Sequence, residues 1–187
     1  MAFGRFNWRV AVVGLALTAL SAVSQANMFV NPGFETGDFT GWTHGGGAVT
    51  NAEAHSGAFS FSGFSSDNVS QTFAATATSS ILQLSFWGKR NGGLFDLVIL
   101  TYSDSSTENV LVNTLGRGND WTFIDLTAEL DAGKSLVGFF IYGTTPGPAF
   151  LDDFNLETVR VVAEPSSYAL IALALLAMGY TARRRKA

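Results

Sequence analysis

The chain has 187 residues, no cysteine and a formal net charge of −4. The charge is unevenly spread, because residues 27–163 carry 5 basic and 14 acidic side chains while the two ends are basic. A nucleic-acid-binding domain would carry a basic patch, and a small disulfide scaffold would need cysteines, so both classes are disfavoured. Apolar residues gather at the two ends, which argues against a multi-span membrane protein.

The first 26 residues have the three parts of a secretory signal peptide. Arg5 and Arg9 make a basic start, Val10–Leu20 is an apolar run of 11 residues, and Ser24–Ala26 places small side chains at a cleavage site. As a helix the run would rise about 16 Å, against a hydrocarbon core of about 30 Å, so a short membrane anchor fits less well. We expect the secretion translocase to export the chain, and the mature protein to begin near Asn27.

The last segment, residues 161–187, predicts a single transmembrane helix in the precursor. Tyr168–Ala182 is apolar and uncharged over 15 residues. A basic cluster beside an apolar run stays in the cytoplasm, so the domain would lie outside. At about 22 Å the helix is short for a span, which suits a temporary hold better than a permanent anchor. The basic cluster consists of Arg183, Arg184, Arg185 and Lys186.

A short motif at 163–166 precedes this helix and contains Glu164, Pro165 and Ser166. The order of motif, apolar helix (168–182) and basic tail (183–186) resembles the PEP-CTERM sorting signal of Gram-negative bacteria, with Ala163 where that family usually has proline. The resemblance implies that an exosortase-type enzyme recognises the motif and removes the tail. The protein would then reach the cell surface or the exopolysaccharide matrix. A plain tail anchor is the alternative.

Residues 27–160 have the length of one domain and alternate apolar and polar side chains at period two. Turn residues separate the apolar runs, which predicts an all-β fold, an antiparallel β-sandwich. In the first of the five clearest strands we expect Leu82, Leu84 and Phe86 to face the core and Trp87 to face away. The strands are Ile81–Lys89, Leu94–Tyr102, Trp121–Leu126, Leu136–Tyr142 and Phe150–Leu156.

A series of short motifs in this domain resembles carbohydrate-binding modules with the galactose-binding-like jelly-roll fold. The series starts at Asn31–Glu35 and Gly41–Trp42, continues through Ala54–Ser60, Val69–Phe73 and Leu82–Lys89, and closes at Phe150–Phe154. The resemblance implies a jelly roll whose first and last strands lie side by side. Similar strands also occur in PEP-CTERM proteins with no assigned ligand, so the resemblance supports the fold more than sugar binding.

Glu35 and Asp152 are the most informative carboxylates. By strand alternation Asp152 shares a face with Phe150, Phe154 and Leu156, where an unpaired carboxylate would be costly. The family resemblance implies a structural Ca²⁺ held by Glu35, Asp152 and backbone carbonyls, a set of oxygen ligands that Ca²⁺ accepts. The alternative is that Asp152 faces solvent or accepts backbone hydrogen bonds.

Exposed tryptophans are the candidates for binding polysaccharide, because a pyranose can pack its C–H groups on an aromatic face while polar neighbours bond its hydroxyls. Trp87 points away from the predicted core face, and Trp42 and Trp121 lie near loops. The competing interpretation is that these rings belong to the core, since aromatic residues bury large areas there.

The sequence shows no catalytic residues in a known arrangement. His44 and His55 have no metal-ligand spacing, and adjacent strand residues such as Asp152 and Asp153 should point to opposite faces. We therefore expect no enzyme, but an exported, non-catalytic surface or matrix protein, with glycan binding as a refinement. A glycan-active hydrolase and an ice-binding or adhesion protein are the alternatives.

Overall fold

The structure, a computed structural model, describes residues 27–112 and 119–159. The predicted signal peptide, the predicted transmembrane helix and the sorting motif lie outside the described residues. Within those residues, no helix has the length and apolarity needed to cross a membrane.

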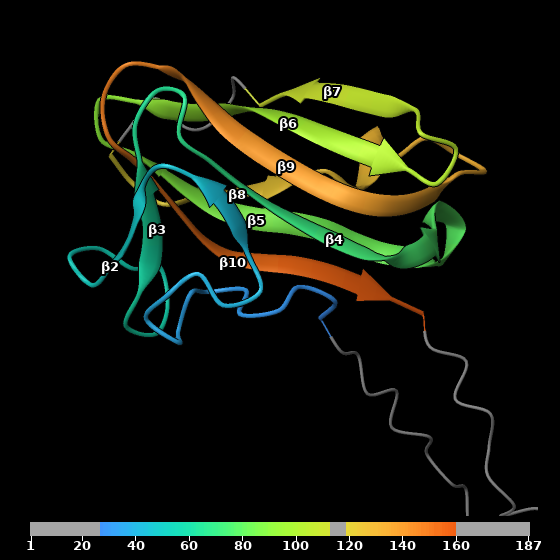
Figure 1. Ribbon diagram of the computed structural model, residues 1–187, viewed down its shortest axis with the longest axis horizontal. Helices are drawn as coiled ribbons and strands as arrows, with labels where there is room; N and C mark the ends of the chain where they lie inside the picture. The colour runs from blue at the N-terminus through green and yellow to red at the C-terminus, as the bar shows by residue number, and fades with distance from the viewer. Residues whose placement is uncertain (1–26, 113–118, 160–187) are drawn as a thin grey trace, which may run out of the picture. The chain divides into compact units, whose positions relative to one another are not determined.

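The described residues form an all-β sandwich of two five-stranded antiparallel sheets (Figure 1), which confirms the predicted fold class. Short 3₁₀ turns stand at Thr78–Ser80 (η1) and Thr127–Glu129 (η2). The first sheet runs in the order β1 (Thr43–Gly45), β4 (Asn68–Ala77), β9 (Ser135–Thr145), β6 (Leu94–Tyr102) and β7 (Thr107–Leu111). The second runs β2 (Ala48–Thr50), β3 (Ser60–Gly63), β10 (Ala149–Thr158), β5 (Ile81–Arg90) and β8 (Thr122–Asp125).

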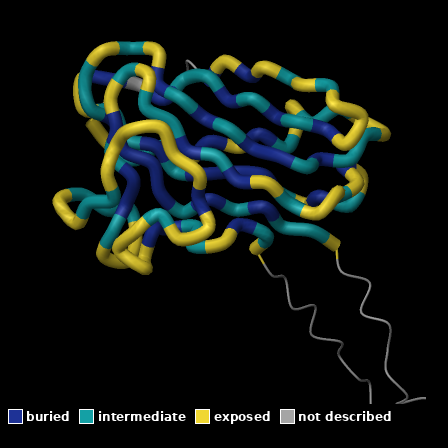
Figure 2. Tube along the Cα trace, in the orientation of Figure 1, coloured by how far each residue is buried: buried dark blue, intermediate teal, exposed yellow. Residues whose placement is uncertain are grey.

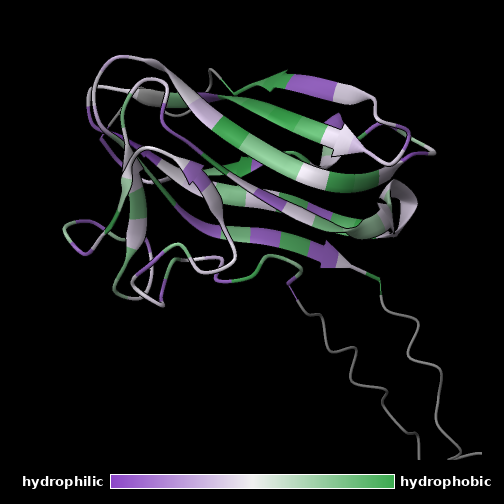
Figure 3. Cartoon of the chain, in the orientation of Figure 1, coloured by the Kyte–Doolittle hydropathy of each residue, from purple (hydrophilic) through white to green (hydrophobic). Residues whose placement is uncertain are grey.

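The strands bury alternate residues, as the sequence pattern predicts. In β9, Phe139 and Ile141 are buried between the sheets while Phe140 and Tyr142 are half-buried on the other face. The same alternation along the neighbouring strands produces a buried layer between the two sheets (Figure 2) and banded hydropathy along the ribbons (Figure 3). The apolar period of two therefore sets which face of each sheet becomes core.

The centre of the core is aromatic. The ring of Phe154 on β10 lies 4.8–6.1 Å, centroid to centroid, from five other aromatic rings. Most of these pairs are tilted or edge-to-face, which is the arrangement that aromatic quadrupoles favour. Rings from the start of the domain thereby pack on its last strand. The five rings are those of Phe29, Phe34, Trp42, Phe86 and Phe139.

The described segment before β1 forms no strand and lies along the last strand, β10, whereas the first strand, β1, pairs with β4 in the other sheet. This segment therefore takes the place that the jelly-roll resemblance predicted for the first strand. The side-chain amide of Asn27 donates to the Phe154 carbonyl at 2.6 Å, and the N–H of Met28 donates to the Leu156 carbonyl at 3.0 Å. The N–H of Phe154 in turn donates to the Pro32 carbonyl at 3.0 Å. These bonds join residues that are far apart in sequence, so they form only when the sandwich closes.

A β-bulge in β10 changes the face that Asp152 occupies. Asp152 pairs with Trp87 and Asn155 pairs with Ser85, so two residues, Asp153 and Phe154, lie opposite one residue of β5. Asp153 has a positive φ of 47°, the left-handed conformation that asparagine and aspartate tolerate. Asp152 therefore faces away from the core while Phe154 faces into it. The prediction that Asp152 shares a face with Phe154 is wrong for this reason.

A second bulge shifts the alternation at the start of β5. Ile81 pairs with Thr158 and Gln83 pairs with Glu157, which leaves Leu82 as an extra residue. Leu82 is 46% exposed, whereas Ile81 and Leu84 are buried. The predicted core positions of Leu84 and Phe86 are confirmed, but that of Leu82 is wrong because the bulge turns it outward.

Two leucine truncations test this bulge. Leu84→Ala removes a fully buried side chain and should lower the free energy of unfolding by about 2–5 kcal/mol. Leu82→Ala, two positions away, should change it by about 0.5 kcal/mol or less, because that side chain is largely in water. Urea unfolding of the two variants measures both. Equal losses would contradict the bulged register.

Candidate functional site

Trp42 lies in the core, so the prediction that it binds a ligand is wrong. Its side chain is 7% exposed, and its ring stacks between Phe29 at 5.5 Å and Phe34 at 5.2 Å. Its indole N–H donates to the Asn31 carbonyl at 3.0 Å, which satisfies the one polar atom of the ring. A ligand would find no free face there. A position beside a turn does not distinguish an exposed tryptophan from one that closes the end of a sandwich.

Trp87 and Trp121 come together around His55 on the outer side of the second sheet. Trp87 follows the core-facing Phe86 and points outward, as expected. The His55 ring stacks on Trp87 at 3.8 Å with an interplanar angle of 15°, and it meets Trp121 edge-on at 5.6 Å. One face of the Trp87 ring is therefore covered by a protein side chain.

His55 belongs to the loop of residues 53–59, which two carboxylates hold by its backbone. The N–H groups of His55 and Ser56 donate to Asp152 Oδ2 at 2.7 and 3.2 Å. The N–H of Ala58 donates to both Glu35 oxygens at 3.0 and 2.9 Å, and the N–H of Phe59 donates to Glu35 Oε1 at 3.0 Å. The structure thus brings Glu35 and Asp152 to the same loop, as the metal hypothesis required, and satisfies both with backbone donors.

Asp153 points to the same loop as Asp152. Its carboxylate contacts His55 Nδ1 at 2.6 Å and accepts a bond from the Ser56 hydroxyl at 2.7 Å. The expectation that adjacent aspartates of a strand point apart is wrong here, because the left-handed backbone of Asp153 breaks the alternation. Both carboxylates are engaged by the loop, and Asp152 is completely buried beneath it.

The surroundings of Asp152 do not fully stabilise its charge. Burial raises the pKa of its carboxyl to about 6, and the charge of Asp153 adds to the effect, although the N–H groups of His55, Ser56 and Asp153 oppose it. A cation beside this group would lower the pKa again. No basic side chain is bonded to Asp152 among the contacts of the described residues.

Glu35 and Asp152 supply carboxylate oxygens, the type of ligand that Ca²⁺ prefers. A Cβ added at Gly33 would lie 3.1 Å from Asp152 Oδ1 and 3.6 Å from Glu35 Cγ, so the two side chains approach the same glycine. Each carboxylate has about four lone-pair positions and keeps some of them unused. The described residues hold no cluster of three or more acidic, histidine or cysteine ligands, so carbonyls or water would complete the six to eight oxygens. The calcium site stays a prediction.

Melting with calcium or chelator tests the site. Without a cation, the stabilising contribution of protonated Asp152 is fully present below its unfolded pKa of 3.8 and is lost as the pH rises through about 6. Ca²⁺ at Glu35 and Asp152 should therefore raise the melting temperature at pH 7, and by less at pH 5, where protons compete.

Asp152→Asn should abolish that response, and Asp120→Asn, an exposed aspartate, is the control. Identical melting with Ca²⁺ and with chelator at pH 7 would rule out the site.

The outer face of the first sheet is a second candidate surface, which the sequence prediction missed. The register aligns its side chains in three rows across the strands, and the term outer face refers to these three rows. The run Leu94–Tyr102 is apolar at nearly every position, so its sequence does not tell which side chains face out, and the register does. The rows are Thr43, Ser70, Phe140, Ile99 and Asn109; Gly45, Asn68, Tyr142, Leu97 and Leu111; and Thr72, Gly138, Thr101 and Thr107.

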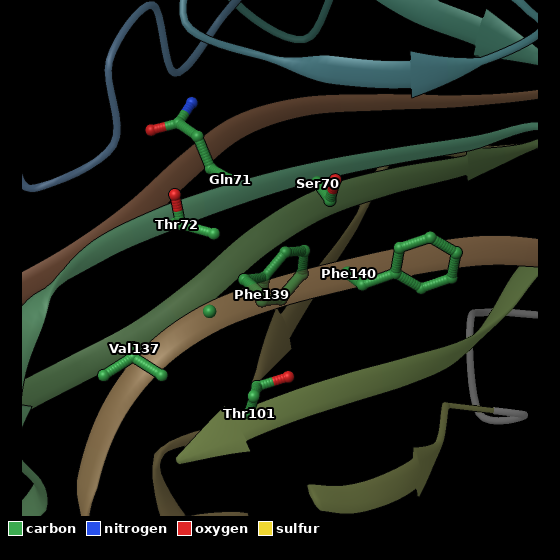
Figure 4. A pocket seen from close by; sticks show the side chains of 8 residues that line it. Ser70, Gln71, Thr72, Thr101, Val137, Phe139 and Phe140 are labelled. Atoms are coloured by element: carbon green, nitrogen blue, oxygen red, sulfur yellow. The ribbon is translucent and has the colours of Figure 1, made fainter. Parts of the chain in front are cut away.

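The outer face combines aromatic rings with hydroxyl and amide groups. Phe140 and Tyr142 lie 5.7 Å apart, centroid to centroid, with their ring planes tilted by 56°. Beside Phe140 is a hollow of about 160 Å³, where Figure 4 shows Thr72 on β4 and Thr101 on β6 on either side of β9. Aromatic faces beside hydroxyl groups can pack on the C–H groups of a sugar and bond its hydroxyls.

Solved structures with the same architecture include carbohydrate-binding modules. TmCBM61, determined in complex with β-1,4-galactotriose, is 23% identical over 72% of this chain and 99% of its own, with a TM-score of 0.50. A family 16 carbohydrate-binding module is 16% identical over 70% of this chain and 99% of its own, also with a TM-score of 0.50.

The enzymatically active domain of tailspike protein 4 from bacteriophage CBA120 is 16% identical over 71% of this chain, with a TM-score of 0.51, but the match spans 21% of the tailspike chain. At these identities the likeness establishes the jelly-roll fold alone. No protein-family model matches the chain, and no curated protein does.

Proposed function

We propose that this protein is a non-catalytic polysaccharide-binding module that binds through the outer face of the first sheet. The observation that carries the proposal is the Phe140–Tyr142 pair beside the hollow, flanked in register by Ser70, Thr72 and Thr101. A binding face for sugars needs exposed ring surface and hydroxyl-bonding groups close together, and this face supplies both. The carbohydrate-binding modules among the structures of the same fold support the proposal.

The tryptophan cluster on the second sheet supports binding less well. His55 covers one face of Trp87, and the remaining neighbour of that ring, Phe123, lies 5.4 Å away at a tilt of 56°. The polar groups beside Trp87 are also engaged, since Lys89 pairs with Glu53 at 2.6 Å. Trp121 and Trp87 therefore serve first to hold the 53–59 loop on the sheet.

The absence of catalysis is part of the proposal. A glycan hydrolase of the usual kind needs two carboxyl groups open to the substrate on either side of the bond that it cleaves. Asp152 and Asp153, the adjacent pair, are instead bonded to the 53–59 loop, and Asp152 is buried. The three rows of the outer face contain no carboxyl group. Sugar binding without cleavage is the chemistry that this arrangement favours.

The proposed location is the cell surface or the exopolysaccharide matrix of a Gram-negative cell. The signal-peptide pattern at 1–26 supports export, and the PEP-CTERM-like pattern at 163–186 supports membrane retention followed by exosortase processing. Without its basic ends the domain carries an excess of acidic over basic side chains. Such a charge keeps a protein soluble among hydrated polymers.

Removing the central ring tests the binding face. Phe140→Ala in the full chain should weaken retention by a soluble neutral polysaccharide in affinity electrophoresis at least tenfold, about 1.4 kcal/mol, because the stacking surface is lost. Phe123→Ala is the matched control, since that ring is 44% exposed on the other sheet. If Phe123→Ala abolished retention and Phe140→Ala did not, binding would belong to the tryptophan cluster instead.

The tail is tested by the intact mass of the native protein after cell fractionation. Processing predicts a mature chain that lacks the residues after about 164, found outside the inner membrane. Replacing Glu164 and Pro165 by alanine should leave the unprocessed chain in the membrane fraction. A wild-type protein that keeps Arg183–Lys186 in the inner membrane would show that the tail is a plain anchor.

A further inference from the structure

A furrow crosses the first sheet at Gly138. In the third row, Gly138 on β9 stands in register between Thr72 on β4 and Thr101 on β6. A glycine between two threonines leaves a gap in the row, and this gap belongs to the hollow beside Phe140 (Figure 4). The furrow is therefore lined by the Phe140 ring on one side and by the side chains of Thr72 and Thr101 at its two ends.

The backbone does not require glycine at this position. The φ angle of Gly138 lies outside the left-handed region, unlike those of Gly133 and Gly147. An added Cβ would lie 3.4 Å from Thr101 Cβ and 3.7 Å from its hydroxyl, which are ordinary contact distances. Glycine weakens the interior of a strand, and it often marks a place where a ligand comes close to the backbone. Its effect here is to keep the furrow open.

The furrow is small and uncharged. Its volume of about 160 Å³ is below the roughly 300–1,000 Å³ of a pocket that encloses a whole small ligand, so it suits one unit of a longer chain. All side chains of the three rows are uncharged, in a domain with 14 acidic and 5 basic residues between 27 and 163. Two carboxylates at the ends of β6 are engaged by hydroxyl groups: Asp96, near its start, accepts hydrogen bonds from Thr144, and Asp104, just after it, accepts hydrogen bonds from Ser106.

The aromatic pair indicates what kind of chain fits. The planes of Phe140 and Tyr142 differ by 56°, so the two rings cannot both lie flat on one planar surface. A crystalline polysaccharide face is planar, whereas a single chain in solution can turn between successive units. The acidic domain would also repel a polyanion before it reached the uncharged face.

We infer that the furrow holds one sugar unit of a single, uncharged polysaccharide chain that lies across β4, β9 and β6, and that Gly138 determines which units fit. The inference rests on the proposed function and narrows its ligand class. A unit with a bulky or charged substituent at this point would meet Thr72, Thr101 or Phe140 and would be excluded.

The test fills the furrow without touching the core. Gly138→Leu places a side chain in the open gap, and Ala128→Leu adds the same side chain at an exposed turn as the control. Full-length proteins with matching melting curves are compared by affinity electrophoresis in linear galactan, soluble β-glucan, polygalacturonate and alginate, and by sedimentation with microcrystalline cellulose.

We expect wild type and Ala128→Leu to bind at least one neutral soluble polysaccharide with little dependence on salt. Gly138→Leu should lose at least tenfold of that affinity, and Gly138→Ala should fall between them. Wild-type binding to polygalacturonate, alginate or crystalline cellulose alone would overturn the ligand class.

The experiment distinguishes failure of the inference about the furrow from failure of the proposed outer binding face. Unchanged binding of Gly138→Leu together with loss in Phe140→Ala would overturn the furrow and leave the outer face as the binding surface. Binding by wild type to none of the five polysaccharides would overturn the proposed function, and the inference with it.

Discussion

The bulge at Asp153 and Phe154 determines which side chains of the last strand face the core and which face the outside of the second sheet. By inserting one extra residue, it turns Phe154 into the aromatic core and leaves Asp152 on the outside. Phe154 then packs against Phe29 and Trp42 from the start of the domain, while Asp152 accepts hydrogen bonds from the backbone of the 53–59 loop. Without the bulge, one of these two side chains would lie on the wrong face.

The bulge also makes the two outer surfaces of the sandwich different. On the second sheet, the 53–59 loop is held by Glu35, Asp152 and Asp153, and its His55 covers Trp87. On the first sheet, the rows around Phe140 stay accessible and uncharged. The first sheet thus carries the face that we propose to bind a polymer, while the second carries the carboxylates of the predicted calcium site.

Local sequence patterns were sufficient for the five clearest strands, but not for short strands such as β1, β2 and β7 or for the site. The runs Leu94–Tyr102 and Phe150–Leu156 are strands because their alternation is strong and turn residues bound them. The prediction that Leu82 faces the core was wrong because a bulge depends on the pairing of two strands and leaves no signature in the sequence of one of them. The prediction for Trp42 was wrong because its burial depends on Phe29 and Phe34, which reach it only when the segment that begins at residue 27 lies along β10.

The sequence by itself determined the all-β class, the positions of the five clearest strands, the outward direction of Trp87 and the acidic character of the domain, because each follows from local alternation, turn chemistry or counting. Only the tertiary structure decided which face Asp152 occupies, that His55 covers Trp87, and that Phe140, Tyr142 and Gly138 share the outer face of the first sheet. The reason is register: side chains alternate with a period of two residues, so a shift of one residue between paired strands exchanges the inside for the outside.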